Sequence, residues 1–299
     1  MSEQKKQFGW TGVNVPTIGQ GTWMIEGDGS PAAEQRAIET LRIGLDLGLA
    51  HIDTAEMYGN GRVEEMVSKA IKGRSRDEVF LVSKVLPTNA SYEGTLRACR
   101  QSLKRLGTDY LDLYLLHWPS DTHPIKETMR AMEKLVAEGL IKFIGVSNFN
   151  VKELKAAQQA LSEQRIGCNQ VLHHLGYRGI EKNLLPYCTR ERIAIVGYSP
   201  FGHGTYPPPS NNNNKAKGRR ILEEIGRRHG RTSRQVTLNF LARHPNLFTI
   251  PKTSSPEHVK ENSGGMGWKL TEEDVSTIDH AFLAPDNKNN DEDAPLEMI

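Results

Sequence analysis

His51-Ile52-Asp53-Thr54-Ala55-Glu56-Met57-Tyr58-Gly59-Asn60 combines an apolar run, a carboxylate and a phenol in one short stretch. The apolar run predicts a buried strand over residues 50–54, and Asp53 lies at its end. Tyr58 follows in a glycine-flanked turn, which is an unusual place for a phenol. We therefore predict that Tyr58 is a proton donor and that Asp53 belongs to the group of side chains that controls its acidity.

The same alternation of a short apolar run and a helical segment repeats along the chain. Apolar runs occupy residues 18–23, 50–54, 79–83, 110–116, 143–146, 168–172, 193–198 and 247–250. Helices are predicted at residues 31–50, 63–72, 92–106, 125–138, 152–161 and 184–192. Continuous apolar runs without polar alternation are typical of parallel strands buried on both faces. The pattern predicts an α/β fold, a (β/α)8 TIM barrel that forms a single domain over residues 1–299.

Segments outside this repeat are predicted to lie at the edges of the barrel. Residues 8–18, broken by Gly9, Gly12 and Pro16, predict a short N-terminal hairpin. Residues 202–217 carry three consecutive prolines and four asparagines, a composition that predicts an unpacked, mobile loop. A further helix and an acidic tail from Pro285 onward, poorly ordered at its end, are expected at the C-terminus.

Composition limits the range of partners. Lys and Arg number 38 against 36 Asp and Glu, so a net charge of +2 gives no reason to expect nucleic acid or an anionic membrane surface. Three widely spaced cysteines indicate neither a disulfide framework nor a thiolate metal site. No run approaches the roughly 20 apolar residues of a membrane-spanning helix, and the N-terminus has no secretory signal. These features predict a cytoplasmic protein.

Polar side chains end the predicted strands, and in a barrel of this kind they face one mouth. Lys84 closes an apolar strand, so its ammonium group needs a carboxylate partner, for which Asp53 on the adjacent strand is the candidate. A cation close to Tyr58 would lower the pKa of the phenol from its usual value of about 10 and make it a usable general acid. The imidazole of His117 would hydrogen-bond a substrate oxygen. Together these four side chains are suited to polarise and protonate a carbonyl group.

Several short motifs in this order resemble the aldo-keto reductases over residues 18–262. They are Asp53-Thr54-Ala55 with Tyr58-Gly59-Asn60, Lys84, Leu116-His117-Trp118-Pro119, Gly145-Val146-Ser147-Asn148-Phe149, Tyr198-Ser199-Pro200 and Ile250-Pro251-Lys252. The resemblance implies a nicotinamide cofactor that gives a hydride to an aldehyde or ketone, with Tyr58 supplying the proton. It also implies a catalytic set of Asp53, Tyr58, Lys84 and His117.

By matching position, the resemblance implies cofactor contacts from Gly21, Thr22, Asp53, Ser147, Asn148, Gln170, Tyr198, Ser199, Phe201, Gly202, Lys252, Thr253, Ser255, His258, Glu261 and Asn262. The substrate-binding residues would be Trp23, Tyr58, Leu86, His117 and Trp118. His258 stands where NADP-preferring members typically carry an arginine, and an imidazole cannot fork onto a 2′-phosphate as a guanidinium does. We therefore expect NADP(H) to bind, with NAD(H) also accepted because discrimination is weakened.

Two other functions are compatible with a barrel of this type. One is a nicotinamide-binding regulatory or subunit protein with little turnover, although such a protein has no need of Tyr58. The other is a metal-dependent hydrolase, but the adjacent His173 and His174 point to opposite sides of a strand, and no metal site is predicted. We expect a small-molecule carbonyl substrate and favour a monomer.

Overall fold

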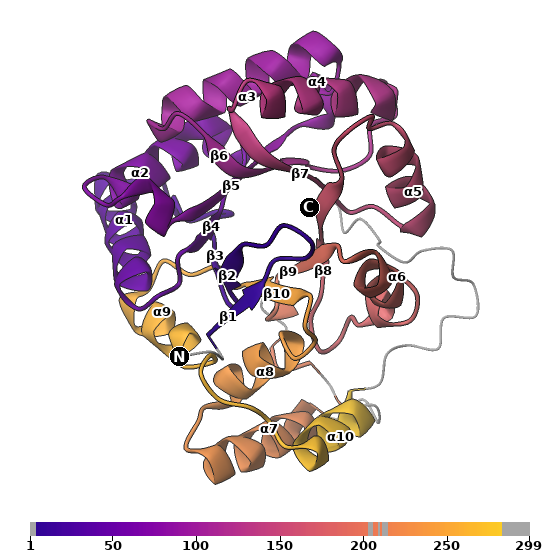
Figure 1. Ribbon diagram of the computed structural model, residues 1–299. Helices are drawn as coiled ribbons and strands as arrows, with labels where there is room; N and C mark the ends of the chain where they lie inside the picture. The colour runs from indigo at the N-terminus through magenta and orange to yellow at the C-terminus, as the bar shows by residue number, and fades with distance from the viewer. Residues whose placement is uncertain (1–3, 203–205, 209, 211–214, 283–299) are drawn as a thin grey trace.

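Eight parallel strands form a closed barrel in the computed structural model, which describes residues 4–202, 206–208, 210 and 215–282 (Figure 1). In chain order the strands are β3 (Gln20–Gly21), β4 (His51–Asp53), β5 (Phe80–Val85), β6 (Leu111–Leu116), β7 (Ile141–Ser147), β8 (Ile166–Leu172), β9 (Ala194–Tyr198) and β10 (Leu247–Ile250). Bridges between Ile18 and Thr249 and between Gly21 and Lys252 close the sheet. The predicted (β/α)8 barrel is confirmed.

Helices cover the outside of the barrel. They are α1 (Pro31–Asp46), α2 (Arg62–Ile71), α3 (Tyr92–Leu106), α4 (Ile125–Ala137), α5 (Val151–Gln159), α6 (Leu184–Glu191), α7 (Lys215–His229), α8 (Ser233–Leu241), α9 (Pro256–Ser263) and α10 (Glu272–Ala281). The sequence specifies several of their starts. Ser30 caps α1 by accepting from the amide of Ala33, and Asn150 forms a reciprocal capping box with Glu153 at α5.

A hairpin closes one end of the barrel (Figure 1). It pairs β1 (Lys5–Gln7) with β2 (Asn14–Pro16), so its first strand precedes the predicted range of 8–18 and its second strand lies within that range. Phe8 is therefore not in a strand. It is fully buried, and its ring lies 4.9 Å from the rings of both Phe80 and Phe248 at the amino ends of the strands. The hairpin thus fills the floor of the barrel and leaves the carboxyl ends of the strands as the mouth.

Some predicted boundaries were wrong. The first strand contains only Gln20 and Gly21 instead of residues 18–23, and a Cβ at Gly21 would lie 2.7 Å from the carbonyl oxygen of Ile250. The first helix ends at Asp46 instead of residue 50. The third strand extends to Val85, beyond the predicted end at residue 83. None of these shifts moves a candidate site residue away from the mouth.

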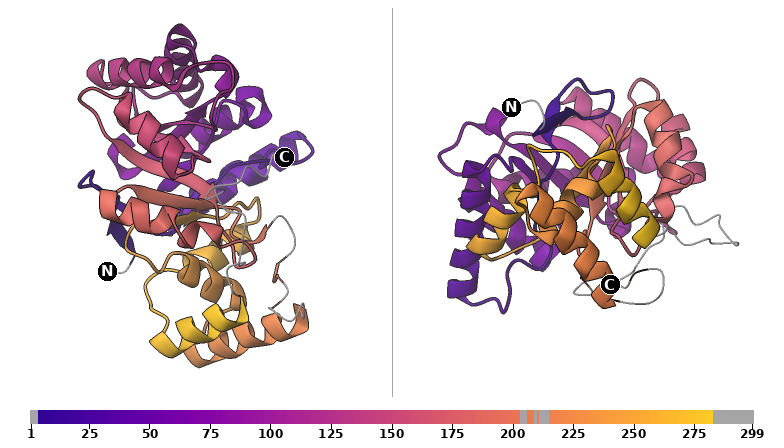
Figure 2. Two further views of the ribbon diagram at one scale, coloured as in Figure 1. Left: turned by 90° about the vertical axis from the view of Figure 1, so that its right-hand side faces the viewer. Right: turned by 90° about the horizontal axis from the view of Figure 1, so that it is seen from below.

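Helices α7, α8 and α10 build a second apolar core beside the barrel (Figure 2). Tyr206 packs against this core, its hydroxyl lies 3.0 Å from Thr237 Oγ1, and Pro207 and Pro208 are buried. The prediction of an unpacked loop over 202–217 was therefore wrong for these residues, because their rings are packed instead of being exposed to solvent. Residues 203–205, 209 and 211–214 of that prediction, and the tail from Pro285, lie outside the described residues.

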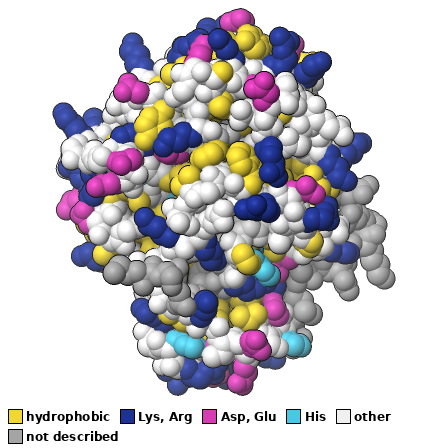
Figure 3. Space-filling model, viewed as in Figure 1, with side chains coloured by type: hydrophobic (Ala, Val, Ile, Leu, Met, Phe, Trp, Pro, Cys, Tyr) yellow, Lys and Arg dark blue, Asp and Glu magenta, His cyan; other side chains and the backbone are white. Residues whose placement is uncertain are grey.

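The surface carries both signs of charge. Figure 3 shows Lys and Arg side chains interspersed with Asp and Glu side chains on the face that bears the hairpin. In the part of the chain that the structure describes, no helix has the length and apolar character needed to cross a membrane.

Candidate active site

The barrel brings the predicted site residues to its mouth from separate strands. Asp53 ends β4, Lys84 is the penultimate residue of β5, and His117 directly follows β6. Ser147 ends β7 and Tyr198 ends β9. Residues far apart in the chain therefore form one site because parallel strands end at the same edge.

Lys84 lies at the centre of the predicted catalytic group. Its side chain is fully buried, and its ammonium group donates to Asp53 Oδ1 at 2.6 Å, to the carbonyl oxygen of Thr54 at 3.0 Å and to Tyr58 Oη at 3.2 Å. All three ammonium protons therefore have acceptors, as a buried cation requires. The structure brings together the lysine, the carboxylate and the phenol that the sequence placed at separate strand ends.

A left-handed turn holds Tyr58 in place. The turn η1 (Tyr58–Gly61) has φ values of 55° at Gly59, 52° at Asn60 and 89° at Gly61. Glycine tolerates this conformation freely and asparagine better than most residues, which explains the composition of the turn. The turn directs the phenol back toward β5 before α2 begins at Arg62.

The predicted lowering of the Tyr58 pKa was wrong for this structure. Burial raises the pKa of the phenol above its usual value of 10.0, and the nearby Asp53 carboxylate raises it further. The Lys84 cation acts in the opposite direction but does not outweigh burial, since Asp53 partly compensates its charge. The extent of this burial could not be predicted from the sequence. Tyr58 is consequently held in its protonated form, which is the form that a proton donor needs.

His117 lies beside the phenol. The centroids of the His117 and Tyr58 rings are 5.7 Å apart, with the rings inclined at 72°. Burial, assisted by the Lys84 cation, lowers the pKa of the imidazole well below 6.5, so the ring is neutral at physiological pH. A neutral imidazole can donate one hydrogen bond to a substrate oxygen without contributing a second cation to the site.

Polar side chains from β7, β8 and β9 form the adjacent wall of the mouth. Gln170 Nε2 donates to Asp53 Oδ2 at 2.7 Å, and Ser147 Oγ donates to the carbonyl oxygen of Gln170 at 2.9 Å. Tyr198 Oη donates to Asn148 Oδ1 at 2.9 Å. This amide-rich wall beside an aromatic ring suits a carboxamide-bearing aromatic ring such as nicotinamide. The wall is also hydrogen-bonded directly to the Asp53 carboxylate.

The residues predicted for the phosphates and the adenosine lie at the ends of β9 and β10. Ser199 and Gly202 have φ values of 52° and 58° in the loop after β9. Ser255 caps α9 by accepting from the amide of His258 at 3.3 Å, so the N-terminus of α9 is formed as predicted. The Lys252 and His258 side chains are exposed, while Asn262 is buried. Free amides at a helix N-terminus fit a phosphate group.

Two structural features of the mouth escaped the sequence analysis. Glu56 Oε1 accepts from the amide of Leu86 at 2.7 Å and from Asn89 Nδ2 at 3.0 Å, which fixes the loop carrying a predicted substrate residue. Its position between Asp53 and Tyr58 was the available signal. The predicted substrate-pocket residues Trp23 and Trp118 lie at this same mouth, and each is separated by one residue from the end of its strand, β3 or β6.

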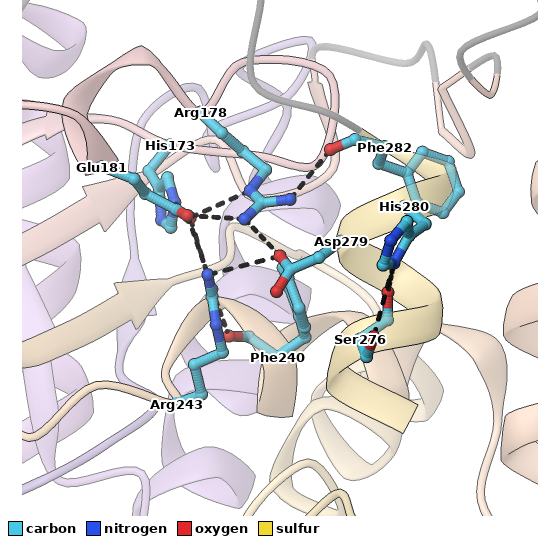
Figure 4. Close-up of polar contacts among 9 residues, drawn as sticks. All are labelled: His173, Arg178, Glu181, Phe240, Arg243, Ser276, Asp279, His280 and Phe282. Atoms are coloured by element: carbon cyan, nitrogen blue, oxygen red, sulfur yellow. Dashed lines mark hydrogen bonds and ion pairs between the residues drawn. The ribbon is translucent and has the colours of Figure 1, made fainter. Parts of the chain in front are cut away.

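The second feature is an ionic cluster beyond β8 (Figure 4). Arg178 donates to Glu181 Oε2 at 2.6 Å, to Asp279 Oδ1 at 2.5 Å and to the carbonyl oxygen of Phe282 at 2.8 Å. Arg243 donates to the same Glu181 oxygen at 2.8 Å. The cluster ties the loop after β8 to α10. It also gives His173 a partner, since His173 Nε2 lies 3.0 Å from Glu181 Oε1. Within the described ranges, no group of three or more His, Cys, Asp or Glu side chains is arranged to hold a metal ion.

Comparison with known proteins places this geometry in a family. The model of the family described as "Aldo/keto reductase family" matches residues 17–282. Methylglyoxal reductase YeaE of Escherichia coli is 39% identical over 286 residues, covering 95% of this chain and 98% of that protein. Glyoxal reductase of Bacillus subtilis is 35% identical over 272 residues, covering 90% and 89% of the two chains. The crystal structure of an aldo/keto reductase from Klebsiella pneumoniae in complex with NADP and acetate has a TM-score of 0.85 at 40% identity, covering 96% of this chain and 98% of that one.

Proposed function

The chain belongs to the aldo/keto reductase family, and we propose that Tyr58 is the proton donor in its NADPH-dependent reduction of carbonyl groups to alcohols. One observation carries the assignment: the Tyr58 hydroxyl lies 3.2 Å from a buried lysine that is itself paired with Asp53. NADPH supplies the hydride for this reaction. The chain supplies the proton and the electrostatic surroundings of the carbonyl oxygen.

Each residue of the catalytic group then has a distinct role. The neutral His117 ring donates a hydrogen bond to the carbonyl oxygen and favours the charge that develops there. Tyr58 transfers its proton to that oxygen as the carbon is reduced. Lys84 stabilises the phenolate left behind, and Asp53 keeps the lysine charged and oriented. Ser147, Asn148 and Gln170 would hold the carboxamide of the cofactor, with Tyr198 against its ring.

We propose small dicarbonyl compounds, methylglyoxal and glyoxal, as the substrate class. The support is the similarity to a methylglyoxal reductase and a glyoxal reductase. The test is to follow NADPH oxidation by the purified protein with methylglyoxal, glyoxal, simple monoaldehydes and ketones. The proposal requires the dicarbonyls to give the highest kcat/KM, and it fails if a monoaldehyde or ketone is preferred. Unchanged turnover after exhaustive chelation would separate this mechanism from a metal-dependent one.

The alternative of a regulatory nicotinamide-binding protein receives no support from the relatives, which are named as reductases. We also propose that the protein works in the cytoplasm as a monomer. The support for the first point is that Cys99, Cys168 and Cys188 are all free and buried, as suits a reducing compartment. Size-exclusion chromatography with light scattering tests the second point.

The ionisation of Tyr58 gives a prediction about pH. Because its pKa is raised above 10.0, the phenol should remain protonated through neutral and mildly alkaline pH in the protein without cofactor. An ultraviolet difference titration of the native protein against Tyr58→Phe should therefore show no phenolate from Tyr58 below about pH 10. Appearance of that phenolate near neutral pH would mean that Lys84 outweighs burial after all.

Position 258 gives a prediction about the cofactor. His258→Arg should increase affinity for NADPH more than affinity for NADH, by about 5- to 10-fold in the ratio, because a guanidinium can fork onto the 2′-phosphate. Dissociation constants from quenching of tryptophan emission provide the measurement. An unchanged ratio would show that residue 258 does not face the 2′-phosphate.

A further inference from the structure

Arg234 is the arginine of α8, and it stacks on two aromatic rings. It lies in the first turn of α8, and its guanidinium carbon is 4.7 Å from the centroid of the Phe201 ring and 5.1 Å from that of Tyr206. Arg178 and Arg243 also lie over an aromatic ring, that of Phe240, but carboxylates and carbonyl oxygens occupy their donors (Figure 4).

The donors of Arg234 have no such acceptors. Among the described residues it makes no side-chain hydrogen bond and no ion pair, although it is half-buried. The two aromatic rings hold the guanidinium by cation–π attraction while leaving its N–H groups available. A positioned guanidinium with free donors is suited to a phosphate group, which accepts two parallel hydrogen bonds from it.

The surroundings of Arg234 belong to the proposed adenosine end of the cofactor site. Phe201 comes from the loop after β9 and packs against an apolar cluster that includes Leu238 of α8 and Val259 of α9. The neighbouring Gln235 donates to the carbonyl oxygen of Glu261 at 2.9 Å, which fixes the first turn of α8 against α9. Arg234 is therefore held beside the helix whose N-terminus is capped by Ser255.

This end of the site needs an additional cation for a 2′-phosphate. His258 offers an imidazole where a guanidinium would form two hydrogen bonds. Lys252 is the one lysine among the residues predicted to line the adenosine, and its side chain is exposed. A 2′-phosphate carries nearly two negative charges near neutral pH, so a second permanently charged partner would stabilise it substantially.

We propose that Arg234 binds the adenosine 2′-phosphate of NADP(H) and is the residue of α8 that makes the chain prefer NADP(H) to NAD(H). The inference rests on the proposed cofactor position at the barrel mouth. The guanidinium that binds the 2′-phosphate would then come from α8, whereas His258 lies on α9. The Phe201 and Tyr206 rings act as the platform that orients Arg234 toward the phosphate.

Dissociation constants of NADP⁺ and NAD⁺, measured by isothermal titration calorimetry, test the proposal. Arg234→Ala should weaken NADP⁺ binding by about 10- to 100-fold and NAD⁺ binding by less than about 3-fold, as expected for loss of a charge-assisted pair. Arg234→Lys, which keeps the charge without the fork, should give an intermediate loss for NADP⁺.

Arg231 provides a matched control. It lies three positions earlier, is also half-buried and stacks on Trp268, with its guanidinium carbon 5.6 Å from the ring centroid. Arg231→Ala should leave both dissociation constants unchanged. Thermal unfolding of each variant shows whether it is folded.

Two outcomes would overturn the proposal: equal losses for both nucleotides in Arg234→Ala, as for a residue that only supports Phe201, or no loss for either. Turnover at saturating NADPH distinguishes failure of the Arg234 proposal from failure of the proposed function. A native protein that does not reduce carbonyls contradicts the function itself. Normal turnover with an unchanged ratio of dissociation constants contradicts only the role of Arg234.

Discussion

Tyr58→Phe should reduce kcat for carbonyl reduction by at least about 10²- to 10⁴-fold, the usual contribution of a positioned general acid. The substitution removes one oxygen atom and leaves a ring of the same shape in a buried position. The T-shaped contact with His117 is therefore retained, and so is the attraction between the ring and the Lys84 ammonium, which lies 4.9 Å from its centroid. The loss is confined to the proton.

Cofactor binding separates loss of the proton from loss of the site. NADPH should still quench tryptophan emission of Tyr58→Phe with a dissociation constant within about 3-fold of the native value, since Tyr58 is not among the predicted cofactor contacts. Tyr187→Phe is the matched control, because Tyr187 lies on α6 and its ring faces Lys155 and Arg190 instead of the catalytic lysine. Activity of Tyr58→Phe equal to that of Tyr187→Phe would exclude Tyr58 as the proton donor.

The sequence could predict the catalytic group because the group depends on topology alone. Once short apolar runs are assigned to parallel strands, the polar residue at the end of each run must lie at the mouth, whatever the details of packing. Asp53, Lys84 and His117 were therefore placed together correctly without any knowledge of the distances between them. The distances of 2.6–3.2 Å from Lys84 Nζ to Asp53, to the carbonyl oxygen of Thr54 and to Tyr58 are a finding of the structure.

The sequence could not predict properties that depend on burial or on packing between distant elements. The direction of the Tyr58 pKa shift follows from the balance between burial and the Lys84 cation, and only the folded structure provides that balance. Likewise, Arg234 and Phe201 are 33 positions apart and meet because α8 packs against the loop after β9. Nothing in the sequence indicates whether the N–H groups of an arginine in a helix will find hydrogen-bond acceptors in the folded protein.

Lys84→Met should destabilise the protein by about 3–5 kcal/mol, because it leaves the Asp53 carboxylate buried without its cationic partner. Asp53 is 2% exposed, so water cannot replace the lost ammonium group. Gln170 still donates to Oδ2, but one neutral amide compensates a buried charge only in part. The free energy of unfolding from denaturant titration provides the measurement. A loss below about 1 kcal/mol would mean that this ion pair contributes no more to stability than a solvent-exposed one, which would contradict the prediction.

The double substitution Asp53→Asn with Lys84→Met determines whether the unpaired charge is the cause. If it is, removing the carboxylate charge from the Lys84→Met variant should restore about 1–3 kcal/mol, whereas Asp53→Asn alone should destabilise the native protein by leaving the ammonium group unpaired. If the double variant is less stable than Lys84→Met, the stability lost in Lys84→Met comes instead from the packing of the lysine side chain. The Lys84→Met variant and the double variant should both lack carbonyl reduction, since Lys84 is the group proposed to stabilise the phenolate form of Tyr58. Stability and activity would then respond differently to the second substitution, because restoring the balance of charge restores folding without restoring the cation that the proton transfer needs.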